Sequence, residues 1–344
     1  MSNVGPVFDW NELGTRPRLL RAGSTLLDET LRDGIQNPSV RDPPIAQKFE
    51  LLQVMNELGV HVVNAGLPAA SDRSRADTEA ICREISRSKL AIRPAAAART
   101  LVSDIVPIVE IAQRVSLPLE LYTFVGSSPV RQMVEDWDVG ELERLVLAAV
   151  EFAVREGLSV CLVTEDTTRS RPEALRCLWR AAIDRGAARV CIADTVGHAT
   201  PDGIRSLVRF CRHVLEEAGA PEVGVDWHGH DDRGFALDNA LRALEAGADR
   251  VHATALGIGE RCGNTAMELL LLNLAELGEL EDLDRRRLKR YCELAAEATG
   301  FVVPALHPLF SEPDGRAAEL KSGPPSGRSA APRPLERSAR LETG

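Results

Sequence analysis

The segment SVCLVTEDTTRSRPEALRCLWRAAIDRGAARVCIADT, residues 159–195, contains one full copy of the pattern that decides the fold. Its apolar runs at 159–163 and 189–193 are typical of buried strands, and the residues between them have the 3.6-residue apolar period of a helix. Pro172 stands where that helix should begin and Gly186 where it should end. The segment therefore predicts a strand, a helix and a second strand parallel to the first.

The same unit recurs along the chain. We expect further helices to begin at Pro201 and Asp232, and others to end at Gly59, Gly157 and Gly247. Eight successive strand–helix units predict an α/β fold of one type, the closed (β/α)8 TIM barrel with its helices outside. The predicted strands are residues 25–27, 60–64, 90–97, 119–124, 159–163, 189–193, 223–227 and 250–255.

Composition shifts divide the chain into four predicted parts. Residues 1–23 lack periodicity and read as an irregular N-terminal arm, while residues 24–280 form the predicted barrel. Residues 281–310 form a C-terminal helical extension with a helix at 283–299. Residues 311–344 are rich in Pro, Ser and Gly and poor in large apolar residues, which predicts a disordered tail.

The overall composition excludes several classes of protein. The 344 residues include 51 acidic and 41 basic side chains, and a net charge of −10 argues against a nucleic-acid partner. No apolar run is long enough to span a membrane, and the start of the chain lacks a signal-peptide pattern, so we expect a cytoplasmic protein. The seven cysteines form no C-x-x-C pair, which disfavours a disulfide framework or a thiolate zinc site.

Unusual polar residues gather where the predicted strands end. In this fold the catalytic groups come from the C-terminal strand ends and the loops that follow them. His228 and His230 are alternate residues of one strand, so both imidazoles can meet the same ion. Asp33 and Asn264 arrive at the same end of the barrel, which predicts a site for a divalent cation such as Mn²⁺, Mg²⁺ or Zn²⁺. The alternative is that the two histidines only cap a strand.

Other polar residues at these strand ends have both a functional and a structural interpretation. Arg32 has a permanently charged guanidinium that can bind a carboxylate or enolate oxygen. The alternative is that it forms an ion pair at the surface. Glu165 and Thr195 lie at the mouth, but each could instead cap a helix. Cys262 also lies near this end of the barrel, and we expect it to be a small buried filler.

Four motifs carry a resemblance to a known family. Residues 28–36 (DETLRDGIQ), 194–201 (DTVGHATP), 228–234 (HGHDDRG) and 257–264 (GIGERCGN) resemble the metal-dependent TIM-barrel acyltransferases and lyases of the HMG-CoA-lyase-like superfamily. Within that superfamily the last motif is most similar to 2-isopropylmalate synthases and homocitrate synthases. The resemblance extends over residues 24–308 and covers the whole predicted barrel.

The resemblance implies an acyltransferase that condenses acetyl-CoA with a small 2-oxo acid in a Claisen-type reaction and releases CoA. It implies a divalent metal held by Asp33, His228 and His230, with Asn264 near or on the metal. Arg32 would then stabilise the keto oxygen as negative charge develops there. The oxo acid expected first is 2-oxoisovalerate, the substrate used in leucine biosynthesis. The resemblance also implies that the protein forms a homodimer.

The resemblance also assigns residues to the substrate pocket. Thr195 would hydrogen-bond the substrate carboxylate, and Glu165 would line the pocket and assist enolisation as a positioned base. Asn64 and Tyr122 stand where many synthases have Glu and His, so both are expected to contact the substrate and to alter the pocket.

Two departures from the pattern keep alternatives open. Ile35 stands where synthases usually have Glu, and it is closer to the pattern of hydroxymethylglutaryl-CoA lyases, so a carbon–carbon lyase or aldolase is the second hypothesis. After Phe310 the chain departs from synthases that continue into further catalytic and leucine-sensing segments, so we expect no C-terminal regulatory domain. A non-catalytic, metal-binding paralogue is the third hypothesis.

Overall fold

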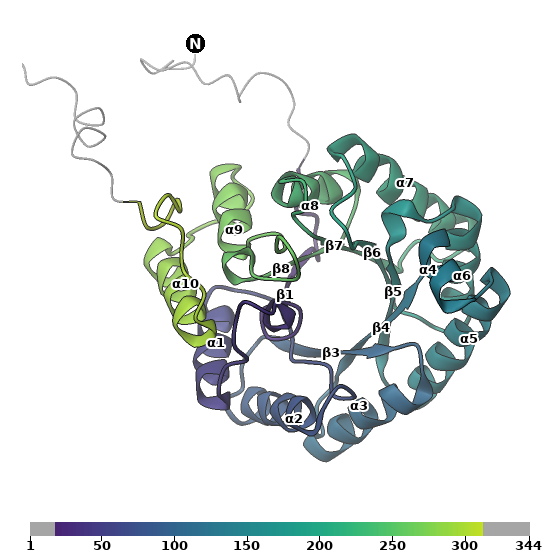
Figure 1. Ribbon diagram of the computed structural model, residues 1–344, viewed down its shortest axis with the longest axis horizontal. Coiled ribbons are helices and arrows are strands. Elements are labelled where there is room, and N and C mark those ends of the chain that lie inside the picture. Colours follow the sequence, from purple (N-terminus) through teal and green to yellow (C-terminus); the bar gives the residue numbers. More distant parts are fainter. Residues whose placement is uncertain (1–17, 312–344) are drawn as a thin grey trace, which may run out of the picture. The chain divides into compact units, whose positions relative to one another are not determined.

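The computed structural model describes residues 18–311, and within them the strands close into a parallel barrel with helices around it (Figure 1). Each strand pairs with its neighbour in sequence order, and β1 pairs with β8 to close the ring. The predicted (β/α)8 fold is therefore confirmed. The strands are β1 (Thr25–Asp28), β2 (Val62–Asn64), β3 (Arg93–Arg99), β4 (Glu120–Gly126), β5 (Ser159–Glu165), β6 (Arg189–Asp194), β7 (Gly224–Gly229) and β8 (Arg250–Ala253).

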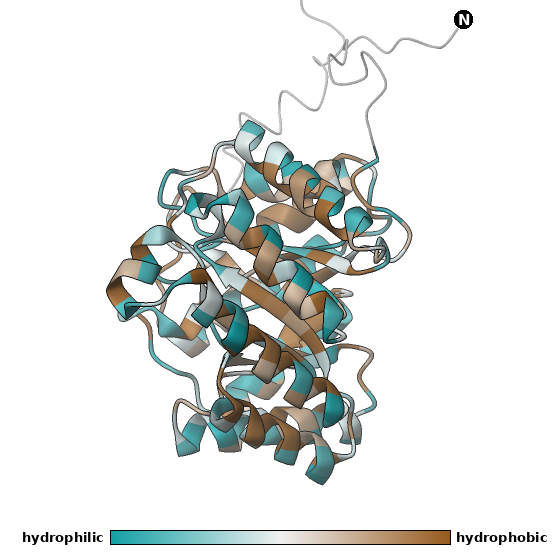
Figure 2. Cartoon of the chain, turned by 90° about the vertical axis from the view of Figure 1, so that its right-hand side faces the viewer, coloured by the Kyte–Doolittle hydropathy of each residue, from teal (hydrophilic) through white to brown (hydrophobic). Residues whose placement is uncertain are grey.

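The helices cover the outside of the barrel and are amphipathic, with apolar and polar residues alternating along them (Figure 2). In one of them, Leu142, Val146, Ala149 and Ala153 are buried at intervals of three or four residues, as expected for a helix with one face on a sheet. The helices are α1 (Ile45–Glu57), α2 (Asp72–Arg87), α3 (Val102–Val115), α4 (Pro129–Glu135), α5 (Val139–Arg155), α6 (Pro172–Asp184), α7 (Pro201–Glu217), α8 (Ala236–Ala246), α9 (Met267–Glu276) and α10 (Arg285–Thr299).

The predicted start of one helix is wrong. Asp232 does not begin α8, which starts four residues later at Ala236. The carboxylate of Asp231 accepts a hydrogen bond from the Ala236 amide at 2.9 Å, so the capping function lies one residue earlier than expected. Gly234 adopts a φ of +73°, which keeps the residues between them out of a helix. The longer loop leaves Asp232 free to pair with Arg261 at 2.8 Å.

One helix had no counterpart among the predicted elements. Helix α4 follows β4 directly, and the Ser128 hydroxyl caps it by accepting a hydrogen bond from the Arg131 amide at 3.3 Å. Pro129 occupies the first turn, where a missing N–H costs nothing. At seven residues, the helix is too short to show a clear apolar period in the sequence. Its main consequence is that it brings Arg131 to the C-terminal end of the barrel.

The barrel interior combines an apolar layer with buried charges. The apolar layer consists of six side chains from six strands, namely Leu27, Val62, Ala95, Tyr122, Cys161 and Cys191. Toward the N-terminal strand ends lie Glu120, Arg189 and Arg250, of which Arg250 is only 2 % exposed. Their charges balance one another: Arg250 pairs with Glu120 at 2.9 Å, and Arg189 donates to Asp226 at 2.6 Å. A buried ion pair of this kind is costly unless both members are satisfied.

The predicted C-terminal helix at 283–299 is confirmed as α10, which lies beside α1 (Figure 1). The Tyr291 hydroxyl donates a hydrogen bond to the buried carboxylate of Asp28 at the end of β1. Arg41 adds a second link by donating to the carbonyl of Ala298 at 2.8 Å. These contacts join the last helix to the segment that follows the first strand.

Some predictions lie largely outside the described residues. The N-terminal arm is described only from residue 18, and the expected disorder of the tail falls on residues 312–344, which the structure does not describe. The chain divides into two units at residue 303, and the described part of the second unit is a set of turns in which the His307 amide bonds the Pro304 carbonyl at 3.0 Å. The proposed boundaries between arm, barrel, extension and tail remain predictions.

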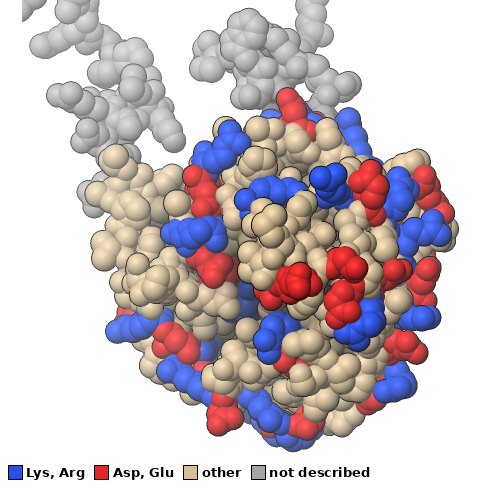
Figure 3. Space-filling view, turned by 45° about the vertical axis from the view of Figure 1, so that its right-hand side comes forward, with Lys and Arg blue, Asp and Glu red and all other residues tan. Residues whose placement is uncertain are grey.

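Two surface properties bear on the predicted partners. Acidic and basic side chains are intermixed on the face shown in Figure 3, so this face has no continuous basic patch of the kind that binds nucleic acid. Within residues 18–311, no helix has both the length and the hydropathy needed to cross a bilayer.

Candidate metal centre and substrate pocket

The loop after β1 presents two charged side chains to the barrel mouth. Asp28 accepts a hydrogen bond from the Thr30 amide at 2.8 Å, and the amides of Arg32 and Gly34 both bond the Glu29 carbonyl at 3.0 Å. These bonds fold the segment into a tight turn directly after the strand. The result is that Arg32 and the next residue, Asp33, lie together at the C-terminal end of the barrel.

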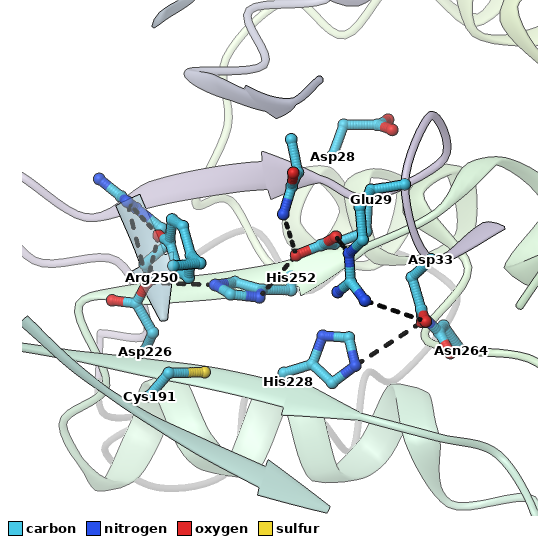
Figure 4. A network of polar contacts seen from close by, with 12 residues as sticks. Asp28, Glu29, Asp33, Cys191, Asp226, His228, Arg250, His252 and Asn264 are labelled. Atoms are coloured by element: carbon cyan, nitrogen blue, oxygen red, sulfur yellow. Dashed lines mark hydrogen bonds and ion pairs between the residues drawn. The ribbon is translucent and has the colours of Figure 1, made fainter. Parts of the chain in front are cut away.

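The two histidines predicted as a pair do converge. His228 is near the end of β7 and His230 follows it, and their Nε2 atoms lie 3.3 Å apart. The Oδ2 atom of Asp33 is 3.7 Å from Nε2 of His228 (Figure 4). The same oxygen is 3.9 Å from Nε2 of His230. All three side chains are buried. The structure therefore brings together the three residues that the sequence predicts as metal ligands.

The glycine-rich loop after β8 places Asn264 against this cluster. The backbone of Asn264 forms an antiparallel bridge with His230, and its side-chain amide donates a hydrogen bond to Oδ2 of Asp33. Gly263 has a φ of +93°, and a Cβ there would collide with the carbonyl of Gly257. The loop can therefore reach this position only with glycine at residue 263.

The cluster fits a divalent cation. Bonds of about 2.1 Å to nitrogen and oxygen would put neighbouring ligand atoms roughly 3 Å apart, close to the separations observed here. Two imidazoles and one carboxylate are a donor set that suits Mn²⁺, Zn²⁺ or Fe²⁺. The Oδ1 atom of Asn264 is buried with no hydrogen-bond partner among the described residues, so it too is available to a ligand. The residues present therefore match the cation that the resemblance implies.

The protonation states favour ligation as well. Burial lowers the pKa of His228 to about 3 and also lowers the pKa of His230, so both rings are neutral near pH 7. Burial acts to raise the pKa of Asp33, but the positive charge of Arg32 outweighs it and holds that pKa below its usual value. Neutral imidazole and ionised carboxylate are the forms that bind metals.

A cavity of about 270 Å³ opens above this cluster. Its wall includes Arg32, Glu165, Thr195 and Tyr122, so four of the five predicted catalytic or substrate-binding residues share one space with the histidines. Asn64 is the fifth and does not line the cavity. It is buried, and its side-chain amide donates a hydrogen bond at 3.2 Å to Glu29, which does line the cavity. Asn64 therefore supports a residue of the cavity wall.

Glu165 lies at the end of β5 in a position suited to proton transfer. Burial raises the pKa of its carboxyl, and the charge of Arg131, whose Nε is 3.6 Å away, opposes that rise. A carboxyl whose pKa is raised toward neutrality is a stronger base than an ordinary one. Neither Glu165 nor Thr195 caps a helix: Thr195 instead accepts a hydrogen bond from the Asp166 amide at 2.8 Å.

The expectation that Cys262 is a buried filler is wrong, because this residue is exposed. It sits on the glycine-rich loop, where the neighbouring Arg261 turns toward Asp232 and pairs with it at 2.8 Å. The loop therefore leaves the thiol in solvent instead of packing it into the core.

Three buried residues near the cavity were not identified from the sequence. Glu29 and His252 line the cavity, and Asp226 lies behind them (Figure 4). Glu29, His228 and His252 form a second cluster of possible ligands. The sequence did contain a signal for this network, because Arg250 and His252 are alternate residues of an otherwise apolar strand and must point the same way.

Together these features define a parallel α/β barrel with a candidate metal centre at the C-terminal ends of its strands, where barrel enzymes have their active sites. The chain belongs to the HMGL-like family, whose sequence profile matches residues 24–294. This agrees with the resemblance carried by the four motifs.

Curated relatives belong to the same family. The chain is 34 % identical to a 2-isopropylmalate synthase of Pyrococcus abyssi over 284 residues, which is 81 % of this chain and 57 % of that protein. It is also 34 % identical to homocitrate synthase AksA of Methanocaldococcus jannaschii over 299 residues, 86 % of this chain and 70 % of that one. The chain thus spans little more than half the length of the Pyrococcus relative.

Solved structures share the fold at lower identity. An HMG-CoA lyase from Acinetobacter baumannii, in complex with coenzyme A and 3-methylmalate, superposes with a TM-score of 0.68 at 21 % identity and covers 93 % of this chain and 100 % of its own. An HMG-CoA lyase from Brucella melitensis superposes with a TM-score of 0.65, also at 21 % identity, and covers 80 % of this chain and 98 % of its own. At this identity the likeness shows the fold.

Proposed function

We propose that this protein condenses acetyl-CoA with a small 2-oxo acid and releases CoA, with 2-oxoisovalerate as the first candidate substrate. The observation that supports this most directly is the convergence of Asp33, His228 and His230 beside Arg32 in one cavity. The names of the curated relatives, 2-isopropylmalate synthase and homocitrate synthase, support the same type of reaction.

In this proposal Asp33, His228 and His230 hold a divalent cation, with Asn264 beside it. Such a cation supplies Lewis-acid polarisation of the oxo acid. The guanidinium of Arg32 lies at the same mouth and donates hydrogen bonds to the keto oxygen as negative charge develops there. Because the site is buried, this charge stabilisation is stronger than it would be in water.

Two further residues of the cavity orient and activate the substrates. The Thr195 hydroxyl donates to the carboxylate of the oxo acid. Glu165 removes a proton from the acetyl methyl group, and the resulting carbanion attacks the keto carbon. The alkoxide that forms takes up the proton held by Glu165 and becomes a tertiary alcohol. Water then cleaves the thioester, so that CoA leaves as a free thiol and the acetyl group ends as a carboxylate.

The wall of the cavity favours an oxo acid with an apolar side chain. Arg32 is the only Lys or Arg among the described residues that line the cavity, and it is already close to two carboxylates. A second substrate carboxylate would therefore lack a cationic partner. The residues that line the cavity also include five apolar side chains, Leu67, Ala97, Phe124, Val163 and Ala193. This supports 2-oxoisovalerate or a similar monocarboxylate over a dicarboxylic oxo acid.

A thiol-release assay tests the proposal. Protein loaded with Mn²⁺ is mixed with acetyl-CoA and one of a panel of 2-oxo acids, and free CoA is measured. We expect release that depends on both the oxo acid and the metal, with branched monocarboxylates preferred over 2-oxoglutarate. Arg32→Gln, which should release CoA far more slowly, is the impaired control, and Arg144→Gln, on the exposed face of α5, is the matched active control. No release with any oxo acid contradicts the proposal.

A second candidate is a carbon–carbon lyase of the hydroxymethylglutaryl-CoA type. The observation in its favour is the exposed thiol of Cys262 on the loop that also carries Asn264. Cleavage of hydroxymethylglutaryl-CoA by the metal-loaded protein, abolished in Cys262→Ser, would identify this activity. Binding of metal with no turnover of either kind would instead indicate a non-catalytic paralogue.

The remaining parts of the proposal concern assembly and location. We propose a cytoplasmic homodimer that acts on small molecules. Light scattering of the purified protein tests the dimer, and cell fractionation tests the location.

A further inference from the structure

Glu29 and His252 are fully buried ionisable residues that the proposed reaction leaves unassigned, although both line the cavity. Glu29 holds the side chain of Arg32 from one side, because its Oε2 accepts a hydrogen bond from Nε of Arg32 at 2.8 Å. The Nη1 atom of Arg32 lies 3.4 Å from Asp33. The orientation of the guanidinium therefore depends on where the Glu29 carboxylate is held.

Two side chains from other strands fix the second oxygen of Glu29. The amide of Asn64, on β2, donates to Oε1 at 3.2 Å, and Nδ1 of His252, on β8, lies 3.4 Å from the same atom. The contact with His252 has the distance of an ion pair rather than the geometry of a hydrogen bond. Glu29 is thus held between strands on both sides of the loop that presents Arg32.

His252 is in turn anchored at its other nitrogen. Its Nε2 lies 3.1 Å from Oδ2 of Asp226 on β7 (Figure 4). Asp226 cannot shift easily, because Tyr122 donates to it at 2.7 Å and Arg189 donates to it at 2.6 Å. The imidazole is therefore a fixed bridge between a rigid carboxylate inside the barrel and the carboxylate that holds Arg32.

From these contacts we propose that His252 is a positioning residue which acts through Glu29 to fix the guanidinium of Arg32 toward the keto oxygen. The role in turnover rests on the proposed function, whereas the fixing of Arg32 does not. The second ligand cluster, Glu29–His228–His252, is on this view not a second metal site. The Glu29 carboxylate already accepts hydrogen bonds from Arg32 and Asn64. The imidazole of His252 is already in contact with the carboxylate of Asp226.

A double-mutant cycle tests the coupling to turnover. We expect His252→Gln to lower kcat/KM for the oxo acid by about 10- to 100-fold, the usual effect of losing a residue that orients a functional group. In an Arg32→Gln background the same change should cost less than about threefold, because residues that act through one another are not additive. An equal loss in both backgrounds would show that His252 acts independently of Arg32 and would overturn the proposal.

A spectroscopic measurement tests the fixing of Arg32 without any assumption about the reaction. The Nε–H resonance of Arg32 is identified by its absence in Arg32→Lys, and its exchange with water is measured by NMR. We expect slow exchange in the unmodified protein and in His213→Gln, an exposed control on α7, and fast exchange in His252→Gln. Slow exchange in His252→Gln overturns the proposal even if the protein proves not to be a synthase.

Metal stoichiometry distinguishes the bridge from a second metal site. Equilibrium dialysis with Mn²⁺ should give one ion per chain for both the unmodified protein and His252→Gln. Two ions in the unmodified protein and one in His252→Gln would assign the cluster to metal and contradict the positioning role. Thermal unfolding of each variant, measured in parallel, checks that the chain remains folded.

Discussion

The Nε2 atoms of His228 and His230 lie 3.3 Å apart with both rings buried, and Oδ2 of Asp33 lies 3.7 Å from the first and 3.9 Å from the second. Two neutral imidazoles at this distance either form an N–H···N hydrogen bond, in which one ring donates, or both direct a nitrogen lone pair at a cation. Because burial lowers the pKa of both rings, both are neutral near pH 7, and the carboxylate of Asp33 beside them completes a set of three ligand atoms. The pair is therefore arranged for a metal ion.

The first prediction concerns that ion. His228→Ala removes one of three converging ligand atoms, and we expect the affinity for Mn²⁺ to fall at least about 100-fold, together with turnover. Metal content after gel filtration, measured by elemental analysis, checks this. His213→Ala, which alters an exposed histidine paired with Glu217, should retain one equivalent. Retention of a full equivalent by His228→Ala would refute the ligand assignment.

The second prediction concerns proton transfer by Glu165. Glu165→Gln should lower kcat by about 10²- to 10⁴-fold while KM changes little, because a general base acts in the transition state. Steady-state kinetics at saturating acetyl-CoA give both constants. If KM rises and kcat is unchanged, Glu165 binds substrate but does not remove the proton.

The third prediction concerns the pH dependence set by Arg131. The charge of Arg131 favours the ionised form of Glu165, so Arg131→Ala should let the pKa of Glu165 rise further. The active, deprotonated base is lost as pH falls through its pKa, so the acidic limb of kcat/KM should move to higher pH. Arg144→Ala should leave the profile in place. A limb that moves to lower pH, or does not move, contradicts this role of Glu165.

The fourth prediction concerns stability and Asp28. Burial raises the pKa of this carboxyl to about 6 despite its bonds to Thr30 and Tyr291. The folded state then binds a proton more tightly than the unfolded state, so this group makes the protein less stable as pH rises from about 4 to about 6. The full cost is roughly 3 kcal/mol. Asp28→Asn removes it.

Urea unfolding at pH 5 and pH 7 measures this effect. The free energy of unfolding of Asp28→Asn minus that of the unmodified protein should be larger at pH 7 than at pH 5, because only the unmodified protein loses stability over this range. Parallel behaviour of the two proteins at both values would show that Asp28 does not titrate in this range.

The fifth prediction concerns the choice of oxo acid. Val163 is one of the apolar side chains that line the cavity, and Val163→Ala should shift the kcat/KM ratio by about tenfold toward an oxo acid with one more methylene than 2-oxoisovalerate. Competition between the two acids in one assay gives the ratio directly. Val154→Ala, on the outer face of α5, should leave the ratio unchanged. A ratio unchanged in Val163→Ala would place the side-chain subsite elsewhere.

Most of the fold could be predicted because strand and helix periods are local. The strand predicted at 189–193 and the helix starting at Pro172 agree with β6 and α6 to within a residue. The start of α8 could not be predicted, because it depends on which of two adjacent aspartates reaches the first helical amide. Helix α4 was missed because a helix of about two turns shows no clear apolar period in the sequence.

The sequence by itself determined the barrel and the convergence of Asp33, His228 and His230, because strand order and alternation place those residues at one end. Only the tertiary structure decided that Asn64 supports Glu29 instead of lining the cavity, that Cys262 is exposed, and that His252 bridges two carboxylates. The physical reason is distance along the chain. Glu29 follows β1, His252 lies on β8 and Asp226 lies on β7, and no local pattern encodes which buried charges meet across a barrel.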